Sequence, residues 1–89
     1  LTVSLAAELA PEIRVNCIAP SLTETGMTKS ITSNDNIKKA IELLHPIPRI
    51  GQPNDHSKLA SYLLCDNNSW ITGQIFNIDG GRSTLRRKG

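Results

Sequence analysis

The chain has 89 residues, which is enough for at most one domain and leaves much of the surface of any such domain unburied. Aromatic residues make up only 3% of the sequence and the net charge is +2, so aliphatic side chains must build the core beneath an ordinary mixed surface. No apolar run approaches the length of a membrane span and no signal peptide is visible, which argues against a membrane protein and makes the cytoplasm the expected location.

Residues 1–10 are predicted to form an amphipathic helix. Leu1, Leu5 and Leu9 recur every four residues, and Pro11 ends the pattern. The helix starts at Leu1 with no capping residue and no initiator methionine. We therefore expect the sequence to begin in the middle of a helix, with further chain upstream of it.

Residues 13–19 are predicted to form a strand, because β-branched side chains fill three of these seven positions. Pro20 has no N–H group to donate to a continuing ladder, so the strand should stop there. The loop that follows, residues 21–27, is rich in hydroxyl groups and contains a glycine. Ligands of open α/β sheets bind just beyond the carboxyl ends of strands, so we expect this loop to be the functional part of the chain.

A second helix is predicted between the capping candidates at residues 33–35 and the two prolines Pro46 and Pro48, which end it. Its apolar residues follow the i, i+3, i+4, i+7 spacing of one helix face. They are Ile37, Ala40, Ile41 and Leu44. This spacing is typical of a helix that packs by one face.

A third helix and a second strand are predicted in the last part of the chain. Pro53 suits the first position of a helix, and Asp55 is favourable in its first turn. Residues 66–69 form a turn cluster after this helix. Gly73 then leads into a short strand over residues 74–78.

The order of these elements predicts an α/β fold in which the two strands are parallel. A helix-strand-helix-helix-strand order requires a crossover connection between the strands, which is right-handed in nearly all known cases. Parallel sheets need cover on both faces and more than two strands. The chain cannot supply both by itself, so we expect it to be the C-terminal piece of a larger domain.

The cysteines and histidines show no metal-binding spacing. Cys17 and Cys65 fit neither a metal motif nor a disulfide framework, and we favour free buried thiols in a reducing compartment over a disulfide. His45 and His56 lie far apart in the sequence with no carboxylate pattern beside them. We therefore expect no metal site.

Three separated motifs cover nearly the whole chain through Leu85. Residues 5–20 read LAAELAPEIRVNCIAP, residues 49–55 read RIGQPND, and residues 71–81 read ITGQIFNIDGG. In order and in spacing they resemble three parts of the short-chain dehydrogenase/reductases. The first resembles the end of the active-site helix and the sixth strand of that family. The second resembles its Arg-x-Gly-x-Pro-x-Asp turn into a helix, and the third resembles its last strand.

The resemblance implies the C-terminal part of a Rossmann-like, doubly wound parallel sheet that is incomplete as a domain. It assigns residues 1–85 to this one NAD(P)-binding domain and leaves residues 86–89 as a basic tail. The activity it implies is hydride transfer between NAD or NADP and a small-molecule alcohol or carbonyl compound.

The catalytic residues that the resemblance implies are absent from this sequence. The family uses a tyrosine, a lysine four residues later and a serine. The only tyrosine here, Tyr62, is followed four residues later by Asp66, and Lys58 precedes it instead. We therefore expect Tyr62 to be a packing or surface residue and the segment to be inactive by itself.

The resemblance also implies a nicotinamide-binding loop made of Pro20, Ser21, Leu22 and Thr25. The family has Pro-Gly after its sixth strand, so Ser21 replaces a glycine whose backbone approaches the carboxamide. Leu22 would offer main-chain groups to the carboxamide, and Thr25 matches a family threonine that contacts the cofactor. The alternative is that Thr23 and Thr25 merely cap a turn.

Residues 27–48 correspond to the mobile lid over the substrate in this family, which makes Met27 the candidate for substrate contact. The third helix and last strand commonly pack against a neighbouring subunit, so we expect a dimer or tetramer. Trp70 is expected to pack under the turn before the last strand.

Two rival functions stay open. The first is a non-catalytic member of the same family that serves only oligomer assembly. The second is nucleic-acid binding by the basic residues 82–89, but this tail is short and lacks interleaved aromatic residues, so a solvated tail is favoured. We expect neither a nucleic-acid partner nor a membrane partner.

Overall fold

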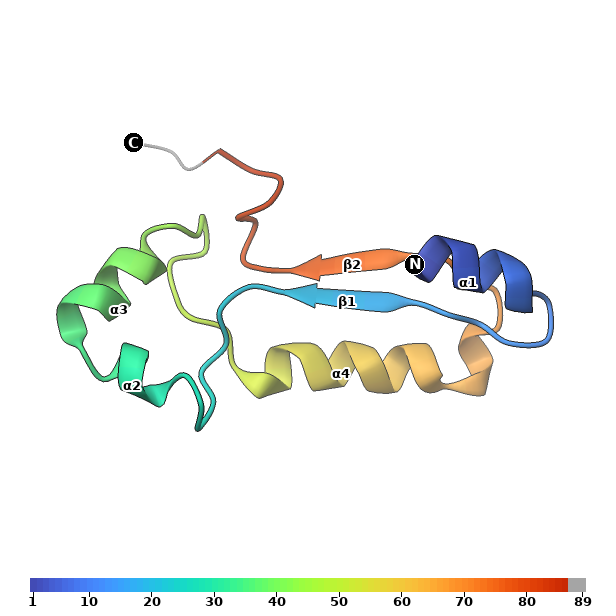
Figure 1. Cartoon of the computed structure of the whole chain (residues 1–89), viewed down its shortest axis with the longest axis horizontal. Coiled ribbons are helices and arrows are strands. Elements are labelled where there is room, and N and C mark those ends of the chain that lie inside the picture. The colour runs from blue at the N-terminus through green and yellow to red at the C-terminus, as the bar shows by residue number, and fades with distance from the viewer. Residues whose placement is uncertain (87–89) are drawn as a thin grey trace.

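A computed structural model of the chain describes residues 1–86 and shows a small α/β unit. Its elements in chain order are α1 (Thr2–Leu9), β1 (Cys17–Pro20), α2 (Lys29–Thr32), α3 (Asp35–Glu42), α4 (Pro53–Leu64), the 3₁₀ helix η1 (Asp66–Asn68) and β2 (Ile75–Ile78). The end of the basic tail, residues 87–89, lies outside the described residues. Figure 1 shows the two strands side by side, with α2 and α3 beyond their carboxyl ends.

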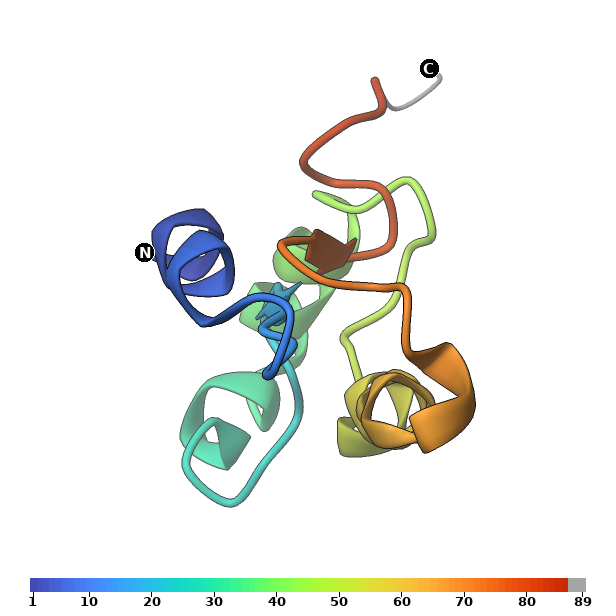
Figure 2. The same ribbon diagram turned by 90° about the vertical axis from the view of Figure 1, so that its right-hand side faces the viewer.

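The two strands are parallel, as the element order predicts. Cys17 pairs with Ile75, and the register runs on to Pro20 opposite Ile78. Seen end on in Figure 2, α1 and α4 lie on opposite sides of the strands, so one helix covers each face. This is the arrangement that a parallel sheet requires, because both of its faces need cover.

The first strand is shorter than predicted, since it begins at Cys17 and not at Ile13. The N–H of Val15 donates to the side-chain hydroxyl of Thr72 (3.0 Å) and not to a backbone carbonyl. The guanidinium group of Arg14 donates to the carbonyl oxygens of Leu63 (2.7 Å) and Ile71 (3.0 Å). Side-chain contacts thus replace part of the ladder here, although the Gly73 N–H still donates to the Val15 carbonyl (2.8 Å). Alternation of residue types cannot reveal such side-chain contacts.

The helices α3 and α4 follow their predicted signals. The side-chain oxygen of Asn34 accepts hydrogen bonds from the N–H groups of Asn36 (3.1 Å) and Ile37 (3.2 Å), which confirms an N-cap within the predicted candidates. Pro53 begins α4 as predicted, with Asp55 in the first turn. The four-residue helix α2 carries no such signal and was not predicted.

The turn after β2 requires glycine. Gly80 and Gly81 have φ angles of +61° and +89°, in the region that side chains with a Cβ rarely adopt. The N–H of Ile47 donates to the carbonyl of Gly80 (3.0 Å), so this turn is joined to the segment that follows α3. The turn after β2 therefore lies beside the segment between α3 and α4.

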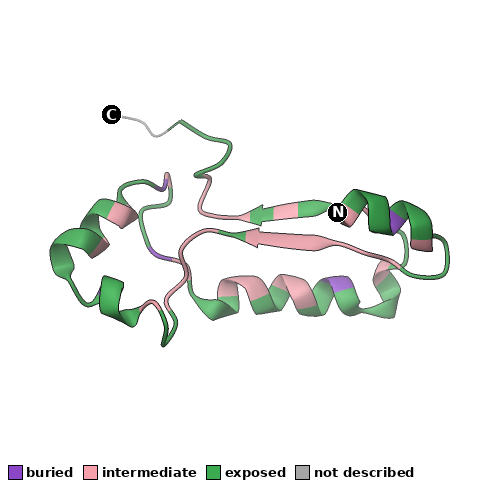
Figure 3. Cartoon of the chain, viewed as in Figure 1, coloured by how far each residue is buried: buried purple, intermediate pink, exposed green. Residues whose placement is uncertain are grey.

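Few of the described residues are buried, as Figure 3 shows. The buried apolar residues are Ala6, Ile50 and Leu63. The prediction for Trp70 is wrong: its side chain is 99% exposed, because no described residue packs over the turn after η1. Both cysteines are free thiols, but Cys17 is only half-buried and Cys65 is exposed, so the prediction that they are buried is also wrong. No helix among residues 1–86 is long and apolar enough to span a membrane.

Candidate functional site

The loop over residues 21–28 leaves the carboxyl end of β1, and all the site residues predicted from the sequence lie on it or beside it. Pro20 is the last residue of β1, and Ser21 and Leu22 are half-buried directly after it. Thr25 is exposed, and Met27 is 93% exposed at the start of the segment that leads into α2. The structure therefore brings these residues to one edge of the sheet.

The loop is fastened to the segment before α4 through Gly51. Thr23 and Gly51 form an isolated parallel bridge, in which the Gly51 N–H donates to the Leu22 carbonyl (3.0 Å) and the Glu24 N–H donates to the Gly51 carbonyl (2.8 Å). A Cβ at position 51 would lie 3.1 Å from the Thr23 Oγ1 atom and 3.3 Å from the Leu22 carbonyl oxygen, so any other residue would push against the loop. The Leu22 carbonyl thus has a partner within the chain, whereas the N–H of Leu22 has none among the described residues.

His45 anchors the loop from the other side. Its side chain is 2% exposed, and its Nδ1 and Nε2 atoms lie 2.8 Å from the Ile41 carbonyl and 2.8 Å from the Ser21 Oγ atom. A carbonyl can only accept, so Nδ1 carries the proton, and in the neutral ring Nε2 accepts from the Ser21 hydroxyl. Ser21, the residue that replaces the usual glycine, thus has a fixed side-chain partner.

His56 contacts the same loop two residues later. Its Nε2 atom lies 2.8 Å from Thr23 Oγ1, and the Thr23 hydroxyl donates to the Ser21 carbonyl (3.1 Å). The hydroxyl proton is thereby used, so Nε2 of His56 must be the donor. Its Nδ1 atom is then a buried acceptor with no hydrogen-bond partner among the described residues.

The sequence gives no hint that the two histidines converge on one loop. They are separated by 11 positions and lie on different parts of the fold, His45 on the segment after α3 and His56 in the first turn of α4. The one available signal was Ser21, a polar residue at a half-buried turn that needs a hydrogen-bond partner. Among residues 1–86, no group of three or more histidine, cysteine, aspartate or glutamate side chains is placed to hold a metal ion.

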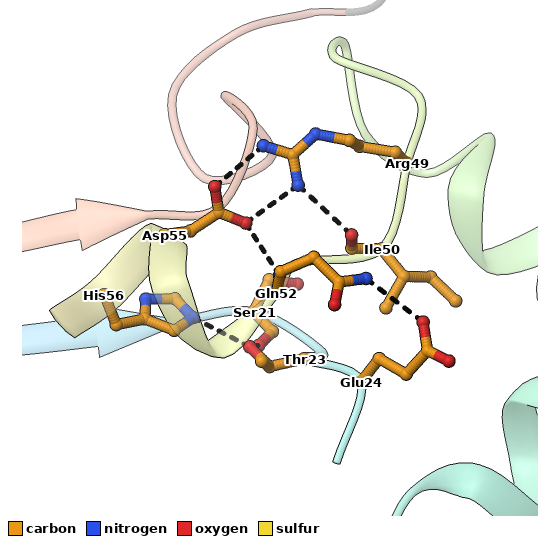
Figure 4. Close-up of polar contacts among 8 residues, drawn as sticks. All are labelled: Ser21, Thr23, Glu24, Arg49, Ile50, Gln52, Asp55 and His56. Carbon is orange, nitrogen blue, oxygen red and sulfur yellow. Dashed lines mark hydrogen bonds and ion pairs between the residues drawn. The ribbon is translucent and has the colours of Figure 1, made fainter. Parts of the chain in front are cut away.

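An ion pair fixes the start of α4 (Figure 4). The Arg49 guanidinium binds the Asp55 carboxylate through two parallel contacts of 2.8 and 2.9 Å, and the N–H of Gln52 donates to the same carboxylate (2.7 Å). The hydrogen bond from Arg49, followed by that from the Gln52 backbone, holds the pKa of Asp55 well below its usual range. The pair keeps Gly51 in place against the loop.

A pocket of about 160 Å³ lies between the loop, the start of α4 and the turn after β2. It combines imidazole, guanidinium and carboxylate groups with apolar side chains. The residues that line it are Ser21, Leu22, His45, Ile47, Arg49, Gly51, Asp55, His56, Ile78, Asp79 and Gly80. A hydrogen bond from the Ser83 side chain lowers the pKa of Asp79.

Thr28, not Thr25, closes the turn within the loop. The Thr28 hydroxyl donates to the Thr23 carbonyl (2.8 Å) and accepts from the Thr25 N–H (2.8 Å). The Thr25 hydroxyl has only longer contacts with Thr28, at 3.3 Å to Oγ1 and 3.4 Å to the backbone nitrogen. The turn is therefore held mainly by a residue that the sequence did not single out, which leaves the exposed Thr25 hydroxyl able to bind a ligand.

Comparison with known proteins places the chain in a family. The model of the enoyl-(acyl carrier protein) reductase family matches residues 1–83. A short-chain type dehydrogenase/reductase from Mycobacterium ulcerans superposes with a TM-score of 0.85 at 34% identity, over 97% of this chain and 32% of that one. This chain belongs to the short-chain dehydrogenase/reductase family.

Other relatives agree with this assignment. An uncharacterized oxidoreductase of Mycobacterium tuberculosis is 43% identical over 83 residues, which are 92% of this chain and 33% of the relative. A structure of 4-hydroxyisoleucine dehydrogenase complexed with NADH shares the fold with a TM-score of 0.88 at 32% identity, over 96% of this chain and 35% of that one. A structure of ElxO with NADP bound shares it with a TM-score of 0.85 at 28% identity, over 94% of this chain and 35% of that one. The chain thus spans about a third of the length of the short-chain dehydrogenase/reductases it matches.

Membership of the short-chain dehydrogenase/reductase family confirms the predicted fold class. The helices and the two parallel strands of the chain form part of a Rossmann-like α/β fold, as the matching solved structures show. The resemblance seen in those motifs is confirmed by the same comparisons.

Proposed function

We propose that this chain is part of an NAD(P)-dependent oxidoreductase that transfers hydride between a nicotinamide cofactor and an alcohol or ketone. The observation that carries the proposal is the hydroxyl-rich loop after β1, fastened from both sides at the carboxyl edge of a parallel sheet, in a chain of this family. Ligands of such sheets bind at this edge. The structures of relatives with bound NADH and NADP support the choice of cofactor.

The role of this segment is to bind and orient the nicotinamide end of the cofactor. When bound, the cofactor supplies or accepts the hydride. The N–H of Leu22 and the hydroxyl of Thr25 are the groups proposed to contact the carboxamide, with Pro20 and Ser21 forming the adjacent wall. These residues fit that role because the Leu22 carbonyl and the Thr28 hydroxyl already have partners within the chain, whereas the Thr25 hydroxyl is exposed and only weakly bonded.

The segment over residues 27–48 is proposed to be the lid over the substrate, with its end held to the rest of the chain through His45 and Ile47. It includes α2 and α3 and lies beyond the carboxyl ends of both strands in Figure 1. Met27 projects an almost fully exposed thioether side chain from the start of this segment, and such a flexible apolar group suits contact with a substrate.

The chemistry itself is assigned to residues outside this chain. Tyr62, the only tyrosine, lies on α4 with 58% of its surface exposed, and no lysine follows it at the required spacing. We accordingly propose that the 89 residues alone are inactive and that a longer protein carrying them, called the parent protein below, is the enzyme.

The alternative proposal is a non-catalytic family member in which this segment serves assembly. Exposed apolar side chains on α4 and β2, among them Leu64 and Ile75, would suit an interface with a second subunit. The dimer or tetramer and the cytoplasmic location stay predictions. A Tyr-x-x-x-Lys pair in the parent protein and cofactor turnover would favour the enzyme over the assembly role.

The test is a cofactor titration of the parent protein, followed by the fluorescence of NADH and of NADPH. The parent protein should bind one of the two, and Thr25→Ala should weaken binding about 3- to 10-fold, the effect of one lost hydrogen bond. Thr84→Ala, which removes an exposed threonine hydroxyl outside the loop, is the matched control and should bind as the wild type does. Unchanged fluorescence at millimolar NADH and NADPH would refute the proposed function.

A further inference from the structure

We propose that His45 is a positioning residue for the nicotinamide cofactor, acting through Ser21 on the main chain of Leu22. The inference rests on the proposed function and adds a residue that makes no contact with the cofactor itself. His45 lies on the segment between α3 and α4, far from Ser21 in the sequence, and reaches it through one hydrogen bond of 2.8 Å.

The burial of His45 indicates that its geometry is fixed. Its exposed fraction is 2%, which makes it as deeply buried as the apolar core residue Ile50, at 3%. A buried polar ring is tolerated when its polar atoms are hydrogen-bonded, and both ring nitrogens of His45 are. The acceptor for Nδ1 is the carbonyl of Ile41 in α3. The ring is therefore bonded to the backbone four residues before His45.

The backbone beside His45 is fixed as well. Two residues later, the N–H of Ile47 donates to the carbonyl of Gly80 in the turn after β2 (3.0 Å). A Cβ at Gly80 would lie 3.5 Å from the Cβ of His45, so the histidine packs directly on this turn. His45 therefore connects α3 and the end of β2 with the loop that leaves β1.

The backbone of Ser21 and Leu22 is held by three contacts. His45 fixes the Ser21 side chain, the Thr23 hydroxyl donates to the Ser21 carbonyl (3.1 Å), and Gly51 donates to the Leu22 carbonyl. In a trans peptide the N–H points away from the carbonyl of the preceding residue. Fixing the Ser21 carbonyl therefore fixes the direction of the Leu22 N–H, the donor proposed for the carboxamide.

Ser21 and His45 each need the other side chain for this hydrogen bond. A glycine at position 21 would leave the buried Nε2 atom of His45 without its hydroxyl partner. An apolar residue at position 45 would leave the Ser21 hydroxyl free to rotate and would remove one of the three contacts that hold this backbone. The hydrogen bond between the two residues already orders this backbone in the free protein. Less conformational entropy is therefore lost when the cofactor binds.

The test measures cofactor dissociation constants for the parent protein, its His45→Leu, His45→Gln and Ser21→Ala variants, and the double variant of His45→Leu with Ser21→Ala. His45→Leu and Ser21→Ala should each weaken NADH or NADPH binding about 5- to 10-fold, the effect of one lost hydrogen bond. The amide oxygen of the glutamine can accept from Ser21, so His45→Gln should recover most of the affinity. The double variant should bind the cofactor about as tightly as the single variant with the larger loss of affinity, because both changes remove the same contact.

Two further measurements separate positioning from general stability. Leu63→Ala, which removes a buried side chain of α4 remote from the loop, should lower the melting temperature with an unchanged dissociation constant. Amide hydrogen exchange at Gly51, whose N–H donates to the Leu22 carbonyl (3.0 Å), should speed up in the free protein of His45→Leu and of Ser21→Ala. Ser21→Ala alters no fully buried side chain, so it reports on the contact even if His45→Leu does not fold.

The outcomes that overturn the inference are distinct from those that overturn the function. A wild-type parent protein that binds neither cofactor overturns both. A wild-type protein that binds, with His45→Leu and Ser21→Ala at the wild-type dissociation constant and only a lower melting temperature, overturns the positioning role alone. Effects that add in the double variant also overturn it.

Discussion

Gly51 is the residue at which the loop after β1 and the turn before α4 come closest. Its two backbone groups bond Leu22 and Glu24, and the absence of a side chain permits that approach. The φ angle of Gly51 is not in the left-handed region, so contact distance and not backbone strain explains the glycine. A side chain here would act directly on the proposed cofactor contact.

Gly51→Ala should destabilise the parent protein by about 1–3 kcal/mol, the usual cost of an added methyl group in a filled space. The new Cβ would meet the Thr23 Oγ1 atom at 3.1 Å and the Leu22 carbonyl at 3.3 Å, so cofactor affinity should fall as well. Urea unfolding and fluorescence titration measure the two effects. Gly26→Ala is the control, because its Cβ would meet nothing within 4 Å; equal losses for the two variants would contradict the argument.

The elements show which features of the chain are local enough to be predicted. The N-cap at Asn34 and the start of α4 at Pro53 were predicted because caps and prolines act on their own few residues. The start of β1 and the exposure of Trp70 were not, because they depend on which distant groups lie opposite them. The contacts of His45 and His56 with the loop depend in the same way on tertiary structure, so the sequence located the loop but not what holds it.

The ion pair at the start of α4 should make stability depend on pH in acid. The folded-state pKa of Asp55 is depressed by Arg49, so its stabilisation is fully present above its unfolded pKa, roughly 3.9, and is lost as the pH falls toward the folded value. Wild-type parent protein should therefore be more stable than Asp55→Asn at pH 7, with the difference shrinking below about pH 4. Urea unfolding at a series of pH values measures this.

Arg49→Gln removes the same ion pair and serves as the companion variant for Asp55→Asn. It should lose stability at pH 7 in the same direction, and its difference from the wild type should shrink over the same acid range. A difference between wild type and Asp55→Asn that stays constant down to pH 2 would show that the pair does not set the stability of this helix start.

The whole molecule is less compact than an independent domain of its length. Its radius of gyration is 15.8 Å, whereas a compact domain of this length should have roughly 12 Å. The buried apolar side chains among residues 1–86 are Ala6, Ile50 and Leu63, and many large apolar side chains are exposed. Two short parallel strands with so small a core cannot offset the conformational entropy of ordering the chain.

The 89 residues prepared alone should therefore not fold cooperatively. Their amide NMR spectrum should show narrow dispersion, and urea should produce a broad change in circular dichroism with a small m-value, because little surface is buried on folding. The parent protein under the same conditions is the control and should show one steep transition. Adding Gly51→Ala to the isolated chain should change nothing, since the contact between Gly51 and Leu22 would not be formed. A dispersed spectrum with a steep transition for the isolated chain would show instead that the interactions around β1, α4 and the His45 anchor are enough to hold this part of the sheet together.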